Sequence, residues 1–127
     1  MIQVHVDKPG GLLRIVFSGK VTAEEAKKFS DEVVEVAAGM KPGFELLAEL
    51  TELESMESGC APFIAKVMDY CNEKGISKVV RVIPDPHKDI GLRIMSIFHY
   101  DRNVRIITVE SVEEAKKVLS GNSSKGV

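Results

Sequence analysis

The chain has 127 residues, which is the size of one domain, because single hydrophobic cores commonly serve roughly 100–150 residues. A formal net charge of −2, with acidic and basic residues interspersed, argues against the basic patch that nucleic-acid binding requires. No apolar stretch approaches the roughly 20 residues needed to cross a bilayer, and the N-terminus lacks a signal-peptide core. We therefore expect a cytoplasmic protein that neither spans a membrane nor binds nucleic acid.

The N-terminal part of the chain predicts a hairpin followed by a helix. Residues 2–6 alternate apolar with polar, residues 12–17 do so less strictly, and turn-forming residues at 7–11 separate them. Thr22 and Glu25 have the spacing of a capping box, in which each side chain satisfies a backbone N–H of the other residue. A first helix should begin there and bury apolar side chains that recur every three to four residues.

The middle of the chain predicts a central strand and a second helix. Residues 44–50 are more continuously apolar than the hairpin, as expected of a strand that is covered on both faces. A solvated acidic loop should follow, with the run Glu49, Glu52, Glu54 and Glu57. Pro62 suits the first turn of a helix, which should end at Gly75.

The C-terminal part predicts two further strands, each followed by a helix. Residues 79–83 and 104–109 have strand composition. Asp85, followed by a proline, should begin a third helix that runs to roughly His99, and Ser111 should begin a fourth in another capping box.

Strands that alternate with helices favour parallel pairing, because each crossover has room for a helix and a right-handed return. We therefore predict an α/β fold with a mixed, largely parallel five-stranded sheet, about four helices and an N-terminal antiparallel hairpin. Residues 1–120 should form one domain, and residues 121–127 a disordered tail.

Three segments carry a family resemblance: the acidic strand exit at 49–53, the helix start Met-Glu-Ser-Gly at 56–59 and the stretch Val-Glu-Ser-Val-Glu-Glu-Ala at 109–115. In their order and spacing they resemble the STAS family of SpoIIAA-like anti-sigma-factor antagonists, over about residues 2–120. The resemblance implies the SpoIIAA-like fold and a regulatory, protein-binding function. In phosphorylated members the serine before the glycine is the switch, which implies Ser58 as a candidate phosphorylation site. Here Glu57 precedes it, where the family has a second hydroxyl residue.

The region of Ser58 has two interpretations. A phosphate would gain from backbone N–H groups at a helix N-terminus, but Glu49, Glu52, Glu54 and Glu57 would repel it. The alternative is that Ser58 only caps the second helix.

The predicted third helix is apolar around most of its circumference, whereas a surface helix normally has one apolar stripe. Leu92, Met95 and His99 form a second stripe, which we interpret as a binding surface for a protein partner or for self-association into a homo-oligomer. The alternatives are that other parts of the chain cover this stripe, or that the domain binds an apolar small molecule or lipid there. The STAS family also resembles lipid-binding CRAL-TRIO-like domains.

No set of residues indicates catalysis, a metal or a cofactor. The acidic run lacks the ligand spacing of a calcium loop. His87 and His99 would be about 18 Å apart along one helix, too far to serve one reacting centre. Cys60 and Cys71 have no metal-site spacing and should be reduced core thiols. We expect a protein that acts by binding and is not an enzyme.

Overall fold

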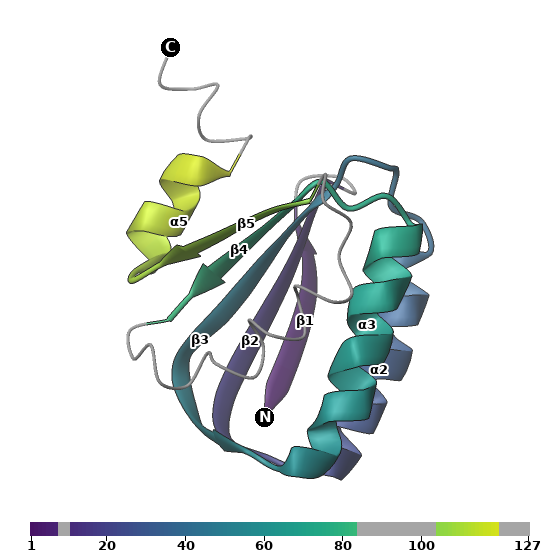
Figure 1. Cartoon of the computed structure of the whole chain (residues 1–127), viewed down its shortest axis with the longest axis vertical. Coiled ribbons are helices and arrows are strands. Elements are labelled where there is room, and N and C mark those ends of the chain that lie inside the picture. The colour runs from purple at the N-terminus through teal and green to yellow at the C-terminus, as the bar shows by residue number, and fades with distance from the viewer. Residues whose placement is uncertain (8–10, 84–103, 120–127) are drawn as a thin grey trace.

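The computed structural model describes residues 1–7, 11–83 and 104–119. These residues form a five-stranded sheet in the order β1-β2-β3-β4-β5 (Figure 1). Strand β1 (Ile2–Asp7) pairs antiparallel with β2 (Leu12–Val21). Strands β2, β3 (Glu45–Met56), β4 (Lys78–Val82) and β5 (Arg105–Val109) pair in parallel. The predicted fold class is confirmed, and β3 is the central strand as expected.

The described helices lie on both faces of this sheet. Helix α2 (Ala23–Ala37) and helix α3 (Ala61–Glu73) pack on one face, and a single 3-10 turn, η1 (Ser58–Cys60), precedes α3. Helix α5 (Val112–Val118) lies on the opposite face (Figure 1). None of the helices in the described ranges is long and apolar enough to cross a membrane.

The helix starts agree with the local sequence signals. Thr22 caps α2, and both hydrogen bonds of its capping box with Glu25 are present. Ser111 caps α5 and accepts a hydrogen bond from the backbone N–H of Glu114. Pro62 lies in the first turn of α3, where its missing N–H costs no helical hydrogen bond.

Strand β3 is longer than the sequence predicts, and the expected acidic loop is wrong. Strand β3 continues to Met56, because β2 extends to Val21 and provides pairing partners for this part of β3. The pairing continues past a bulge near Gly19 of β2, whose φ is 63°. Pairing with β4 ends at Glu49, which is buried and does not belong to a solvated run. Beyond that point β3 continues to pair with β2, and Glu52 and Glu54 are exposed while Leu53 between them is buried.

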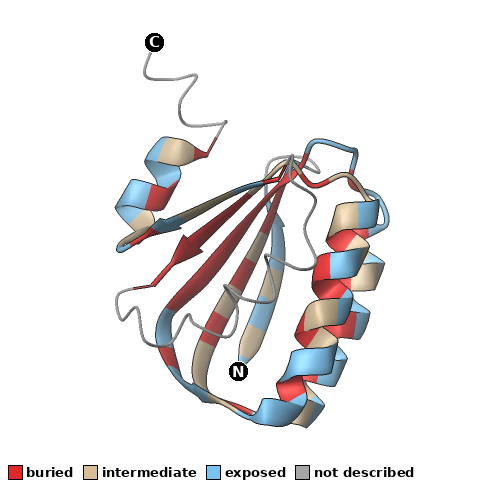
Figure 2. Cartoon of the chain, in the orientation of Figure 1, coloured by how far each residue is buried: buried red, intermediate tan, exposed pale blue. Residues whose placement is uncertain are grey.

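Two apolar clusters pack against the sheet, and the most continuously buried strands in Figure 2 are the central ones. The larger cluster lies between the sheet and helices α2 and α3. Phe17 of β2 and Phe29 of α2 meet in it edge to face, with ring centroids 5.8 Å apart. The smaller cluster lies under α5 and contains Leu12, Leu47, Val80, Val82, Val109, Ala115 and Leu119.

Two predictions lie outside the described residues. The predicted third helix, at 85–99, carries the proposed surface of Leu92, Met95 and His99, and all three are in the range 84–103. The predicted tail, 121–127, also lies outside. Both stay predictions.

Candidate functional site

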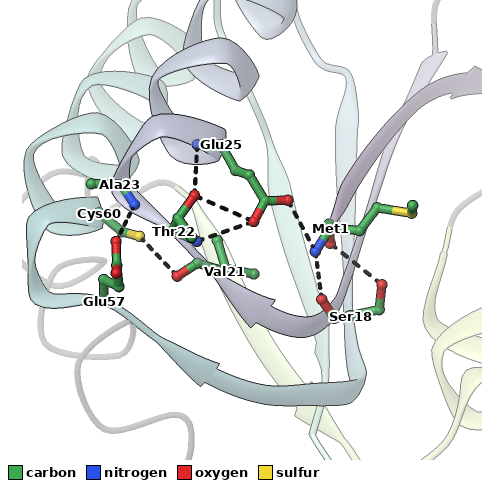
Figure 3. Close-up of polar contacts among 8 residues, drawn as sticks. All are labelled: Met1, Ser18, Val21, Thr22, Ala23, Glu25, Glu57 and Cys60. Carbon is green, nitrogen blue, oxygen red and sulfur yellow. Dashed lines mark hydrogen bonds and ion pairs between the residues drawn. The ribbon is translucent and has the colours of Figure 1, made fainter.

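The candidate site is the junction where β2 and β3 end side by side. The two strands are parallel, and Val21 pairs with Met56 at their carboxyl ends. The backbone N–H of Glu57 then donates to the carbonyl of Val21 at 3.0 Å. Because parallel strands end at the same edge of a sheet, the first turn of α2 and the turn η1 lie next to each other (Figure 3).

A polar network fixes the start of α2. The backbone N–H of Thr22 donates to Oε1 of Glu25 at 3.2 Å, and Oγ1 of Thr22 accepts from the backbone N–H of Glu25 at 3.2 Å. The other carboxylate oxygen of Glu25 lies 3.1 Å from the amino group of Met1, which donates to the carbonyl of Ser18. The hydrogen bond from Thr22, followed by that from the amino group, lowers the pKa of Glu25.

Glu57 connects the β3–α3 junction to α2. Its carboxylate accepts a hydrogen bond of 2.7 Å from the backbone N–H of Ala23, the first residue of α2 (Figure 3). This N–H is one of the four that a helix leaves without an internal partner, and a negative charge at this end is favourable. A Cβ atom at Gly59 would lie 3.0 Å from Cβ of Ala23, so the glycine allows this close approach.

Ser58 is exposed and is the first residue of η1. The interpretation of Ser58 as a cap is wrong, because the N-cap positions of η1 and α3 are Glu57 and Cys60. Neither position has a side-chain cap hydrogen bond. The hydroxyl of Ser58 therefore lies at a helix start whose backbone donors are not satisfied by a side-chain cap.

Both cysteines are free and buried, as expected. Cys60 lies beneath the junction, with Sγ 3.7 Å from the carbonyl of Val21, and burial followed by the charge of Glu57 raises its pKa. Burial also raises the pKa of Cys71 to about 12. Since the thiolate is the reactive form, neither side chain has the properties of a nucleophile in the folded state.

The remaining polar residues named from the sequence do not converge on this junction. Glu52 and Glu54 are exposed positions of β3, and His5 is exposed on β1. In residues 1–7, 11–83 and 104–119, no three His, Cys, Asp or Glu side chains are grouped closely enough to hold a metal ion.

Sequence reasoning placed Ser58 and the capping box but missed the role of Glu57. The hydrogen bond from Ala23 to Glu57 joins residues 34 positions apart. Glu57 has no local pattern that points to Ala23, because the contact depends on the register of β2 with β3. The capping box, by contrast, is contained within four consecutive residues.

The geometry defines an α/β domain that presents an exposed serine at a helix start. Among solved structures, the chain is similar to an uncharacterized DUF3478-family protein with a SpoIIAA-like fold from Shewanella loihica PV-4, at 18% identity over 93% of each chain and a TM-score of 0.72. The unphosphorylated form of the anti-sigma factor antagonist SpoIIAA matches at 12% identity over 100% of each chain, with a TM-score of 0.64.

The phosphorylated form of the Bacillus cell fate determinant SpoIIAA matches at 11% identity over 91% of this chain and 96% of that chain, with a TM-score of 0.63. No protein-family model and no curated protein matches the sequence. At these identities the matches show the fold. The chain has the SpoIIAA-like fold, as the sequence resemblance implies.

Proposed function

We propose that this protein is a regulatory module that binds a protein partner and is switched by phosphorylation of Ser58. The observation that carries the proposal is the position of this serine. Ser58 is exposed at the start of η1, beside the first turn of α2, in a SpoIIAA-like fold. SpoIIAA itself is an anti-sigma factor antagonist with a phosphorylated form.

Phosphorylation would change the charge of this junction strongly. A phosphoserine carries about −1.5 to −2 charges and three acceptor oxygens. The helix start that follows Ser58 has no side-chain cap, so its backbone N–H groups could donate hydrogen bonds to the phosphate. The neighbouring carboxylate of Glu57, which accepts the hydrogen bond from Ala23, would repel the phosphate. A partner in contact with this surface would meet a different charge before and after modification.

The predicted stripe of Leu92, Met95 and His99 is the second surface that we propose for a partner or for self-association. Replacing Leu92 and Met95 by serine should alter the oligomeric state or partner retention in native mass spectrometry. Exposed positions usually change stability by no more than about 0.5 kcal/mol. Unfolding of the double variant would instead identify these side chains as core.

The test of the switch compares two exposed serines of the same segment. Ser55 on β3 is exposed like Ser58 but lies before η1. The wild-type protein, Ser58→Ala and Ser55→Ala are incubated with host lysate and ATP, and intact masses are measured. We expect the wild type and Ser55→Ala to gain one phosphate and Ser58→Ala to gain none.

A second measurement tests the consequence for binding. The phosphorylated and unphosphorylated forms are compared by cross-linking in the same lysate, and partners that depend on phosphorylation are identified. Equal modification of Ser58→Ala and wild type would contradict the switch. Identical partner sets for both forms would contradict its regulatory role.

A further inference from the structure

A groove lies on the α5 face of the sheet, away from the junction of Ser58. It has a volume of about 460 Å³. Ligand sites for small molecules commonly have volumes of about 300–1,000 Å³. By comparison, the small cavity among described residues between the sheet and helices α2 and α3 has about 50 Å³. Of the groove and this cavity, the groove therefore has room for a small organic molecule.

The periodicities of strand and helix build this groove. Alternate residues of a strand point to the same face, so Leu12 and Arg14 of β2 share a face. Leu47 is the register partner of Arg14 on β3. From the opposite side, Val112, Lys116 and Leu119 contribute to the lining. Val112 and Lys116 are four residues apart and lie on one side of α5, and Leu119 is the C-cap of that helix.

The floor of the groove is apolar. Leu12, Leu47 and Leu119 are at most 6% exposed, and all three line it. Such a floor can contact a hydrocarbon body but offers no hydrogen bond, so a ligand must carry its polar group toward the rim.

Two cations lie at the rim. Nε of Arg14 donates to Oε2 of Glu49 at 2.5 Å, and Glu49 is largely buried, with 11% of its side chain exposed. This pair orients the guanidinium and leaves its terminal nitrogens with no bond to a described residue. Lys116 is exposed and makes no ion pair with any described residue. Asp7 also lines the rim, where it would oppose a second negative charge.

We propose that this groove binds a small amphipathic monocarboxylate. Its apolar body lies on Leu12, Leu47 and Leu119, and its carboxylate lies between the terminal nitrogens of Arg14 and the ammonium of Lys116. Guanidinium groups suit this role because their planar N–H groups match the geometry of a carboxylate. Asp7 at the rim would repel a second carboxylate, which favours a ligand with one negative charge over one with several. This site is independent of Ser58 and of its modification.

The experiment titrates the isotope-labelled full chain with sodium octanoate. Binding is monitored by NMR through the chemical shifts of the backbone amides. We expect the largest shifts in β2, β3 and α5 around the groove. Octyl glucoside has a hydrocarbon chain of similar length without the carboxylate, and we expect it to bind more weakly. A dicarboxylate of similar length, suberate, should also bind more weakly because of Asp7.

Two neighbouring lysines supply the matched variants. Lys116 lines the groove, whereas Lys117, the next residue of α5, is also exposed but does not line it. Lys116→Ala should weaken octanoate binding by about twofold to fivefold, as for an exposed ion pair, and Lys117→Ala should leave it unchanged. Asp7→Asn should strengthen binding.

Each contrary outcome overturns the proposal. If no saturable chemical-shift changes occur, or if they are confined to another region, the proposed site is contradicted. Equal effects of Lys116→Ala and Lys117→Ala, or equal binding of octyl glucoside, would remove the assigned recognition of a carboxylate. Circular dichroism of each variant verifies that it is folded before titration.

Discussion

The two faces of the sheet differ in what they bury. Among the described residues, the cluster beneath helices α2 and α3 has 23 buried members, whereas the cluster beneath α5 has seven. The α5 face carries two ion pairs, Arg14–Glu49 and Lys78–Glu45, and a groove. The other face is not wholly apolar, since buried Arg81 lies there and donates to Thr108. Among the described residues, the α2/α3 face therefore holds most of the buried apolar side chains, while charges on the α5 face are held in ion pairs.

The largest expected effect comes from two leucines on opposite faces of β3. Leu50 is 1% exposed in the larger cluster, and Leu47 is 3% exposed on the groove floor. Leu50→Ala should lower the free energy of unfolding by about 3 to 4 kcal/mol, and Leu47→Ala by about 2 kcal/mol, because a site next to a groove leaves a smaller closed cavity. Urea denaturation measures both, and equal losses would break the comparison.

The second expected effect concerns the ion pair at the amino ends of β3 and β4. Nζ of Lys78 lies 3.2 Å from Oε2 of Glu45 and donates to the carbonyl of Val118 at 2.7 Å. Lys78→Met should cost about 2 kcal/mol, because it removes one partner of a nearly buried pair and a contact to the end of α5. Thermal unfolding measures the loss, and hydrogen exchange should show faster opening of α5.

Lys20 serves as the control for Lys78, because it is an exposed residue of β2. Lys20→Met should change stability by less than about 0.5 kcal/mol. A similar loss in both variants would indicate that the ion pair on the α5 face contributes nothing specific.

The smallest expected effect tests how completely water is excluded from Cys71 on the α2/α3 face. Burial raises the pKa of Cys71 to about 12 from a reference value of 9.0, so the folded state retains the thiol proton where the unfolded state loses it. The contribution of the protonated Cys71 thiol to the free energy of unfolding is complete below the pKa of this thiol in the unfolded state. It is lost as the pH rises through the alkaline range toward the pKa in the folded state. Between about pH 8 and about pH 10 the loss should be about 1 kcal/mol.

Cys71→Ala isolates this contribution from other alkaline titrations. The stability difference between wild type and Cys71→Ala, measured by urea denaturation, should shrink by that amount over the same pH range. A constant difference would mean that Cys71 is hydrated in the folded state. The α2/α3 face would then be less completely closed than its apolar contacts indicate.

How far the sequence predicts the structure depends on the distance over which each signal acts. The caps at Thr22 and Ser111 were predictable because the participating residues lie within four positions of each other. The largely parallel pairing of the strands followed from the alternation of strands and helices. The extension of β3 to Met56 was not predictable from its acidic composition, because the partner strand β2 provides the hydrogen bonds.

The candidate site shows the same division. The sequence by itself determined the local elements, the resemblance to SpoIIAA-like proteins and the position of Ser58 before a helix. Only the tertiary structure decided that Glu57 binds Ala23, that Glu49 is buried against Arg14, and that a groove forms beside Lys116. Local patterns are fixed by the backbone geometry of a few consecutive residues, whereas these contacts depend on strand register and on which face each side chain occupies.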